Sequence, residues 1–197
     1  MAVTFHFEDL PKKQQQLITT ATELFFNHGV RRVTINEICR KANVSNMTYY
    51  KYFSDKWDIA KTVLDILFDE VARLYKNIIE EDIPFSHKVE KLLMVMSKED
   101  HTISSELKDD LLNKDSPLHS YVLEQQKKHK EMPINFLKKA QKEGYIQSDI
   151  NIHFLIFIWK SYCNLLDNPD FAQIIPNLEE RTHELAKIFL RAFAKTG

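Results

Sequence analysis

Glycine is scarce in this sequence, and that scarcity limits the folds available to it. There are three glycines in 197 residues, and one of them is the C-terminal residue. The two internal glycines, Gly29 and Gly144, lie far apart, so the chain lacks the clustered glycines of a P-loop or a GxGxxG dinucleotide turn. Few glycines and many strong helix formers favour an all-α fold.

Charge is distributed unevenly along the chain. Residues 1–56, here called the head, carry eight lysines and arginines against five acidic residues, a net charge of +3. The whole chain carries −1, so the remaining residues carry −4. A basic head joined to an acidic body suggests an anionic partner for the head, although runs of charge are usually solvated faces.

Apolar residues recur at helical spacing along most of the sequence. Gly29 is expected to end the first helix, and Pro133 to kink a later one. The patterns, caps and breakers predict about nine helices, at residues 11–27, 35–42, 45–53, 56–80, 86–98, 102–113, 117–143, 150–167 and 178–195. The chain is therefore predicted to be all-α.

The two cysteines, Cys39 and Cys163, both lie in apolar helical patterns. We expect buried free thiols and a reducing, cytoplasmic location rather than a disulfide. The first ten residues lack the basic and then apolar segments of a signal peptide. The longest apolar run, residues 154–159, is far shorter than the roughly 20 residues that span a bilayer, so no membrane partner is expected.

Two short helices separated by a tight turn are predicted between residues 34 and 53. Thr34 and Glu37 have the spacing of a capping box at the start of the first. Asn43 occupies the turn, and asparagine accepts a left-handed backbone more readily than most residues. Ser45 caps the second helix. This is the arrangement of a helix-turn-helix motif, whose second helix lies in the DNA major groove.

The second short helix lies in the stretch NVSNMTYYKYFSDK, residues 43–56, which is rich in aromatic and hydrogen-bonding groups. A helix this short is not stable alone, so part of it must pack on a core. Tyr49 and Phe53, four residues apart, share a face and are expected to point inward. The other faces are expected to carry Asn46, Met47, Tyr50 and Lys51, with Thr48 and Tyr52 at the edge. Such groups read base edges or hold phosphates.

The run VTINEICRKANVSNMTYYKYFSDKWDI, residues 33–59, resembles the N-terminal DNA-binding domain of tetracycline-repressor (TetR) family regulators. The likeness rests on the Thr-Ile…Ile…Ala-x-Val-Ser core, on Tyr50 and Phe53 of a Tyr-x-x-Phe pair, on Lys56, and on a first helix that ends in FFNHG. It covers roughly residues 10–60, and the rest agrees only in length and helical character. Met47 stands where the family often has glycine, and Tyr49 is bulkier than the usual aliphatic residue.

The resemblance implies DNA contacts for this segment. Tyr50, Lys56 and Thr34 would contact phosphates, and Met47 and Thr48 would meet base edges. The full predicted set is Thr34, Asn46, Met47, Thr48, Tyr50, Lys51, Tyr52 and Lys56, in which Lys51 and Tyr52 could take either role. Packing on the first helix is the alternative for Tyr52, and a solvated side chain is the alternative for Lys51.

The resemblance also implies a DNA-binding domain at residues 1–56 and an effector-binding and dimerisation domain, a helical bundle, at residues 57–197. Family members pair their last two long helices with those of a partner, and helix 150–167 is apolar on nearly all sides. A two-fold homodimer would place two recognition helices about one DNA turn, ~34 Å, apart and would require a near-palindromic operator. The predicted dimer interface is Leu155, Trp159, Leu185, Ile188, Phe189 and Ala192.

In the family, a small-molecule effector binds among the middle helices and changes the spacing of the two heads. The candidate pocket residues are Phe68, Tyr75, Met94, Met96, Tyr121, Phe136, Trp159 and Tyr162, although aromatic and methionine stripes are more often core. Few charges fall among them, so the expected effector is apolar or amphipathic. Helix 56–80 is the one continuous predicted element from pocket to head, so effector binding is expected to displace it and to weaken operator binding.

Other functions are also considered. The same fold would serve a transcriptional activator or a co-repressed regulator as well as a repressor. An all-α module that docks a protein is a second alternative, and its binding would not weaken steeply with salt. An enzyme is not expected, because no histidine has a partner at i+4 and acids such as Asp109 and Asp110 fall on a predicted polar face. No catalytic residue, cofactor or metal site is predicted.

Overall fold

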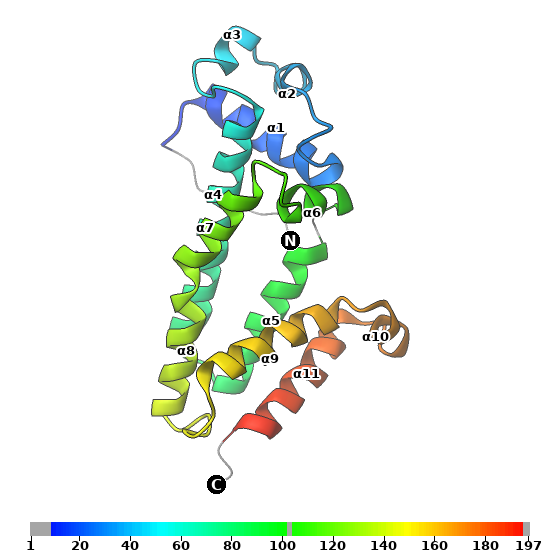
Figure 1. Ribbon diagram of the computed structural model, residues 1–197. Coiled ribbons are helices and arrows are strands. Elements are labelled where there is room, and N and C mark those ends of the chain that lie inside the picture. The colour runs from blue at the N-terminus through cyan, green and yellow to red at the C-terminus, as the bar shows by residue number, and fades with distance from the viewer. Residues whose placement is uncertain (1–8, 102–103, 195–197) are drawn as a thin grey trace. The chain divides into compact units, whose positions relative to one another are not determined.

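The computed structural model describes residues 9–101 and 104–194 (Figure 1). Regular structure in these ranges is helical, apart from an isolated bridge between Ile146 and Ala194. The helices are α1 (Lys12–His28), α2 (Ile35–Ala42), α3 (Asn46–Tyr49), α4 (Lys56–Glu80), α5 (Phe85–His101), α6 (Ser105–Leu112), α7 (His119–His129), α8 (Glu131–Lys142), α9 (Ile152–Leu166), α10 (Pro169–Ile174) and α11 (Leu178–Phe193). The predicted all-α fold is confirmed.

Eleven helices form in the described ranges, where the sequence predicts about nine. The predicted helix 117–143 is interrupted at Lys130, so Pro133 lies in the first turn of α8, where its missing N–H is not needed. α10 is not predicted, and it forms because the Asn168 side chain accepts hydrogen bonds from the backbone N–H groups of Asp170 and Phe171. α3 is shorter than predicted, since it ends at Tyr49 and a tighter turn follows.

Contacts divide the described chain into two compact units. The first unit comprises residues 9–72 and 104–128, and the second comprises residues 73–101 and 129–194. α4 contributes to both, because the division falls after Ala72. The first unit therefore includes α6 and most of α7 as well as the head. The predicted functional boundary after residue 56 stays a prediction.

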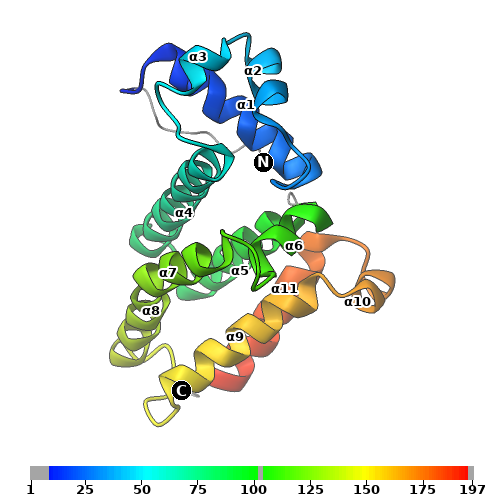
Figure 2. The same ribbon diagram turned by 45° about the horizontal axis from the view of Figure 1, so that its top comes forward.

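The core of the first unit forms where α1 meets α2 and α3 (Figure 2). Leu17 and Ile18 of α1 are fully buried, as is Ile38 of α2. α2 and α3 have eight and four residues, which is too short for either helix to be stable alone. Packing against α1 therefore holds α2 and α3 in place.

The core of the second unit forms among α5, α8, α9 and α11. α9 and α11 run side by side in both views, and α5 packs against both (Figures 1 and 2). The rings of Trp159 and Phe189 meet edge to face with centroids 5.4 Å apart, a favourable geometry for aromatic pairs. One side of α9 and one side of α11 therefore pack in the chain's own core.

Cys39 and Cys163 are both buried and neither forms a disulfide, as predicted. Burial raises the pKa of the Cys39 thiol, which keeps it protonated and unreactive. None of the described helices combines the length and the apolar character needed to cross a bilayer.

Candidate functional site

Two side-chain caps and one left-handed residue shape the segment from Thr34 to Ser45. The Thr34 hydroxyl accepts a hydrogen bond from the Glu37 backbone N–H at 3.2 Å, which starts α2. Asn43 ends α2 with a φ of 52°, in the left-handed region. The Ser45 hydroxyl accepts from the Thr48 backbone N–H at 3.1 Å, which starts α3. The predicted caps and turn are confirmed, and α2 and α3 form a helix-turn-helix.

α3 is held to the core by Tyr49, whose exposed fraction is 0%. Its hydroxyl donates to the backbone oxygen of Asp55 at 2.9 Å, which fixes the loop that leads into α4. Its ring packs against that of Phe53, which is also buried, with centroids 5.6 Å apart. Burial raises the pKa of the Tyr49 phenol, so the group stays neutral in its apolar surroundings. The predicted inward face is confirmed.

The opposite face of this segment is uncovered. Met47 is 73% exposed and Tyr50 is 58% exposed, and Asn46 and Lys51 are exposed as well. The Asn46 side-chain amide donates to Asn36 at 2.7 Å, which ties α3 to α2. This short segment therefore exposes four different groups to solvent, namely a thioether, a phenol, an amide and a cation.

Thr48 and Tyr52 lie at the edge between these faces, as helical spacing predicts. Thr48 is half-buried, and its hydroxyl lies 2.9 Å from that of Ser45. Tyr52 is half-buried and packs against the core of the first unit, so packing accounts for part of its side chain. The DNA-binding role of these residues stays a prediction.

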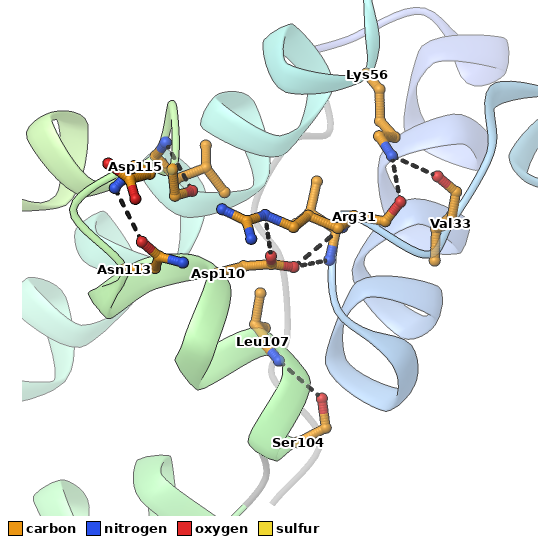
Figure 3. Close-up of polar contacts among 11 residues, drawn as sticks. Arg31, Val33, Lys56, Ser104, Leu107, Asp110, Asn113 and Asp115 are labelled. Atoms are coloured by element: carbon orange, nitrogen blue, oxygen red, sulfur yellow. Dashed lines mark hydrogen bonds and ion pairs between the residues drawn. The ribbon is translucent and has the colours of Figure 1, made fainter.

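Lys56 opens α4 and has a structural role that the sequence does not reveal. Its ammonium donates to the backbone oxygens of Arg31 at 2.9 Å and Val33 at 2.8 Å (Figure 3). Partial burial lowers the pKa of Lys56, and the nearby charge of Asp110 opposes that shift. An ammonium has three N–H donors, and two of them hold the loop before α2. The phosphate contact implied for Lys56 stays a prediction.

Asp110 of α6 positions the same loop, and the sequence gives no sign of it. One carboxylate oxygen accepts from the backbone N–H groups of Val30 at 2.6 Å and Arg31 at 3.0 Å. The other oxygen lies 3.2 Å from Nε of Arg31 (Figure 3). Asp110 is 3% exposed, so its predicted place on a polar face is wrong. Two amides and a guanidinium compensate the buried charge.

Gly29 leaves room for this contact. Its φ of 73° lies in the region that favours glycine. A Cβ at this position would come within 2.9 Å of the Asp110 carboxylate and of Cβ of Glu106. Gly29 therefore ends α1, as predicted, and also allows α6 to approach the loop.

Three of the predicted effector residues line one apolar cleft in the second unit. Tyr75, Phe136 and Trp159 line a partly open cleft of about 290 Å³, a volume that includes open solvent, together with Ile79, Leu92, Pro133, Leu137 and Ile156. A more open cleft of about 370 Å³ adjoins it, because Ile79 and Phe136 line both. An apolar lining of this kind suits the apolar part of a small molecule. Its role as an effector pocket stays a prediction.

Four of the other five effector candidates do not line this cleft. Tyr121 belongs to the first unit, where burial and a hydrogen bond to the Asp65 carboxylate of α4 raise its pKa to about 12. Phe68 packs against the core of the same unit. Tyr162 packs in the core of the second unit, and Met94 is half-buried. The side chain of Met96 lies outside the described residues.

The predicted dimer residues divide into a buried and an exposed group. Leu155, Leu185 and Phe189 are at most 3% exposed, and Trp159 is 7% exposed, because these side chains form the chain's own core. They are therefore not available to a partner, and their prediction as interface residues is corrected. The predicted Ile188 and Ala192 are exposed.

The exposed side of α9 carries three apolar residues that the sequence does not single out. Phe154, Phe157 and Leu165 are 50%, 66% and 40% exposed. At about 100° per residue they fall on one side of the helix. The near-continuous apolar sequence of α9 hides this division, since a core side and an outer side are both apolar.

The fold is all-α, and its head contains a helix-turn-helix formed by α2 and α3. Residues 17–63 match the family described as bacterial regulatory proteins, tetR family, so the helix-turn-helix region of the chain belongs to this family. No group of three or more histidines, cysteines and acids that could hold a metal occurs among the described residues.

Three relatives illustrate the likeness. The HTH-type transcriptional regulator HbdR of Aromatoleum sp. (strain CIB) is 36% identical over 85 residues, which are 41% of this chain and 34% of HbdR. The HTH-type transcriptional repressor KstR2 of Mycobacterium tuberculosis is 21% identical over 144 residues, 71% of this chain and 72% of KstR2. The structure of FadR from Bacillus subtilis with stearoyl-CoA has a TM-score of 0.66 at 16% identity, and the likeness covers 90% of this chain and 95% of FadR. The chain thus spans about a third of HbdR, and the likeness to FadR is one of fold.

Replacing Asp110 by alanine is expected to lower the free energy of unfolding by about 2 kcal/mol, because the buried Val30 amide loses its acceptor. Asp109→Ala is the matched control, since Asp109 is an exposed neighbour on the same helix, and its effect should stay within about 0.5 kcal/mol. Urea unfolding followed by circular dichroism measures both. Equal stability of the two variants would contradict the role given to Asp110.

Proposed function

We propose that this protein is a ligand-responsive transcriptional repressor that binds a near-palindromic operator as a dimer and is released by a small apolar or amphipathic effector. The observation that carries the proposal is the two-sided character of α3 and of the turn that follows it at Tyr50. Tyr49 is fully buried, whereas Met47 and Tyr50 are mostly exposed. Core packing of Tyr49 therefore fixes the orientation of the exposed Met47 and of Tyr50, whose ring meets the Tyr49 ring edge to face with centroids 5.4 Å apart, as a recognition helix requires.

The exposed side of α3 suits the major groove. Met47 and Thr48 would face base edges, where the threonine methyl can contact a thymine methyl. The Tyr50 hydroxyl and the Lys51 ammonium would contact phosphates and fix the register. The capped start of α2 at Thr34 would add a further phosphate contact. The net charge of +3 on the head would attract the DNA phosphates, and this attraction would make part of the affinity for DNA depend on salt.

Two copies would associate through the outer sides of α9 and α11. Phe154, Phe157 and Leu165 form the exposed apolar side of α9, and Ile188 and Ala192 are exposed on α11. Because the two helices run side by side, these residues would contribute to one surface (Figure 1). Clustered exposed apolar residues are typical of interaction surfaces. Two-fold pairing would double the recognition helix and require a near-palindromic operator.

The effector would occupy the apolar cleft lined by Tyr75, Phe136 and Trp159. KstR2 is described as a ketosteroid regulator, and FadR was solved with stearoyl-CoA, so the molecules named for these two relatives each contain a large apolar part, a steroid skeleton or an acyl chain. α4 would transmit the signal, because it is one helix that begins at Lys56 beside the helix-turn-helix and reaches the cleft at Tyr75. The effector would release DNA only if it binds better to one position of α4 than to the other.

The DNA-binding role is tested by Lys51→Ala. Removing one phosphate contact is expected to weaken binding to every duplex and to reduce the slope of log affinity against log salt by about 1. Thr48→Ala is expected to change the preferred base and to leave the slope unchanged. Lys114→Ala, which removes an exposed lysine between α6 and α7, is the control. Fluorescence anisotropy of labelled duplexes over a range of salt concentrations measures all three, and a Lys51→Ala slope equal to that of the control would rule out the contact.

The dimer interface is tested by Phe157→Asp. A carboxylate at the centre of an apolar interface would be buried without a partner, so the variant is expected to sediment as a monomer at concentrations where the wild type is a dimer. Leu123→Asp is the matched control, because Leu123 is a similarly exposed apolar residue on α7 in the first unit, and it should leave the dimer intact. A dimeric Phe157→Asp variant would place the interface elsewhere.

A further inference from the structure

The more open cleft of the second unit differs in chemistry from the apolar cleft beside it. Two lysines line it, Lys88 of α5 and Lys139 of α8, together with the aromatic residues Phe85 and Tyr145. Glu143 is the acidic side chain in this lining. A cationic opening therefore leads to an apolar interior.

Three stacked rings form one wall of the more open cleft, from its buried end to its solvent-facing end. Phe136 lies next to Phe85 with ring centroids 5.6 Å apart and planes at 26°, and Phe85 lies next to Tyr145 at 4.9 Å and 11°. Phe136 is 9% exposed and also lines the apolar cleft, whereas Tyr145 is 48% exposed. The wall thus connects the apolar cleft with the solvent-facing opening.

The chain holds the outer end of this wall in place. Gly144 takes a φ of 80°, which allows the chain to turn after α8. The backbone N–H of Tyr145 donates to the oxygen of Ala140 at 2.9 Å, and Ile146 is buried at 1% exposure. The opening is therefore bounded by an ordered turn.

The two lysines differ in how they are held. Nζ of Lys88 donates to the backbone oxygen of Ile79 at 2.7 Å, which uses one of the three N–H donors of an ammonium. Nζ of Lys139 lies 3.7 Å from the Glu143 carboxylate, and both side chains are largely exposed. An exposed ion pair of this kind contributes little to stability, so the anionic group of a ligand can displace the Glu143 carboxylate from Lys139. The three ionisable side chains of the lining sum to a charge of +1.

We infer that the two clefts form one site for an anionic amphiphile, with its apolar body in the inner cleft and its carboxylate or phosphate group at Lys88 and Lys139. The inference rests on the proposed function, because it names the chemical class of the effector. Apolar lining alone would suit a neutral molecule equally well, whereas the lysines discriminate by charge. Charge-assisted hydrogen bonds to ammonium groups are roughly twice as strong as neutral ones, so the head group sets the preference.

The test is calorimetric titration of the full-length protein, refolded to remove any bound molecule, with decanoate, decyl phosphate, decanol and decyltrimethylammonium. The anions are expected to bind about tenfold more tightly than decanol, and the cation more weakly than decanol. The ratio between decanoate and decyl phosphate identifies the preferred head group. Equal binding of decanol and both anions, or no binding of either anion, would overturn the inference.

Three variants locate the head group. Lys139→Ala is expected to weaken binding of the anions about fivefold and to leave decanol unchanged. Glu143→Gln removes the competing carboxylate and should strengthen binding of the anions about threefold. Lys138→Ala is the control, because Lys138 is an exposed neighbour that does not line the cleft. Equal anion affinities for Lys139→Ala and Lys138→Ala would also overturn the inference.

Operator release separates this inference from the proposed function. If the anions bind as expected but leave operator affinity unchanged, the site stands and ligand-responsive repression fails. If a neutral or cationic compound releases the operator while the anions do not bind, the proposed function stands and the inference fails.

Discussion

A helix of four residues cannot hold its own shape, so everything that α3 presents depends on the burial of Tyr49. The ring fixes α3 against the core, and the hydroxyl fixes the loop into α4 through the oxygen of Asp55. The Ser45 cap and the left-handed Asn43 set the angle at which α3 leaves α2. With these contacts in place, Met47 and Tyr50 remain exposed, and the edge-to-face contact with the Tyr49 ring helps to orient Tyr50.

The sequence predicts those parts of the structure that depend on near neighbours. The Thr34 and Ser45 caps, the Asn43 turn and the inward position of Tyr49 each depend on residues within a few positions, so their spacing reveals them. Asp110 could not be predicted in this way, because the amide it binds belongs to Val30, 80 residues earlier. Its neighbour Asp109 carries the same carboxylate group but is exposed, so residue type does not distinguish the two.

The second unit shows a different limit of sequence reasoning. α9 is apolar on both its inner and its outer side, so periodicity alone does not tell Leu155 in the core from Phe157 on the surface. The effector residues were likewise predicted by residue type, and of the candidates whose side chains the structure describes, Tyr75, Phe136 and Trp159 line one cleft. The lysines of the adjoining opening, Lys88 and Lys139, come from different helices far apart in the sequence, so spacing gives no signal of a shared site.

The account depends most on the claim that α3 reads DNA as one half of a symmetric pair. Selection from random duplex DNA with purified, ligand-free protein, followed by sequencing, tests that claim directly. The account predicts enrichment of a near-palindrome with half-sites centred about one DNA turn, ~34 Å, apart. Failure to enrich any sequence, with protein that was also denatured and refolded to remove bound effector, would contradict it.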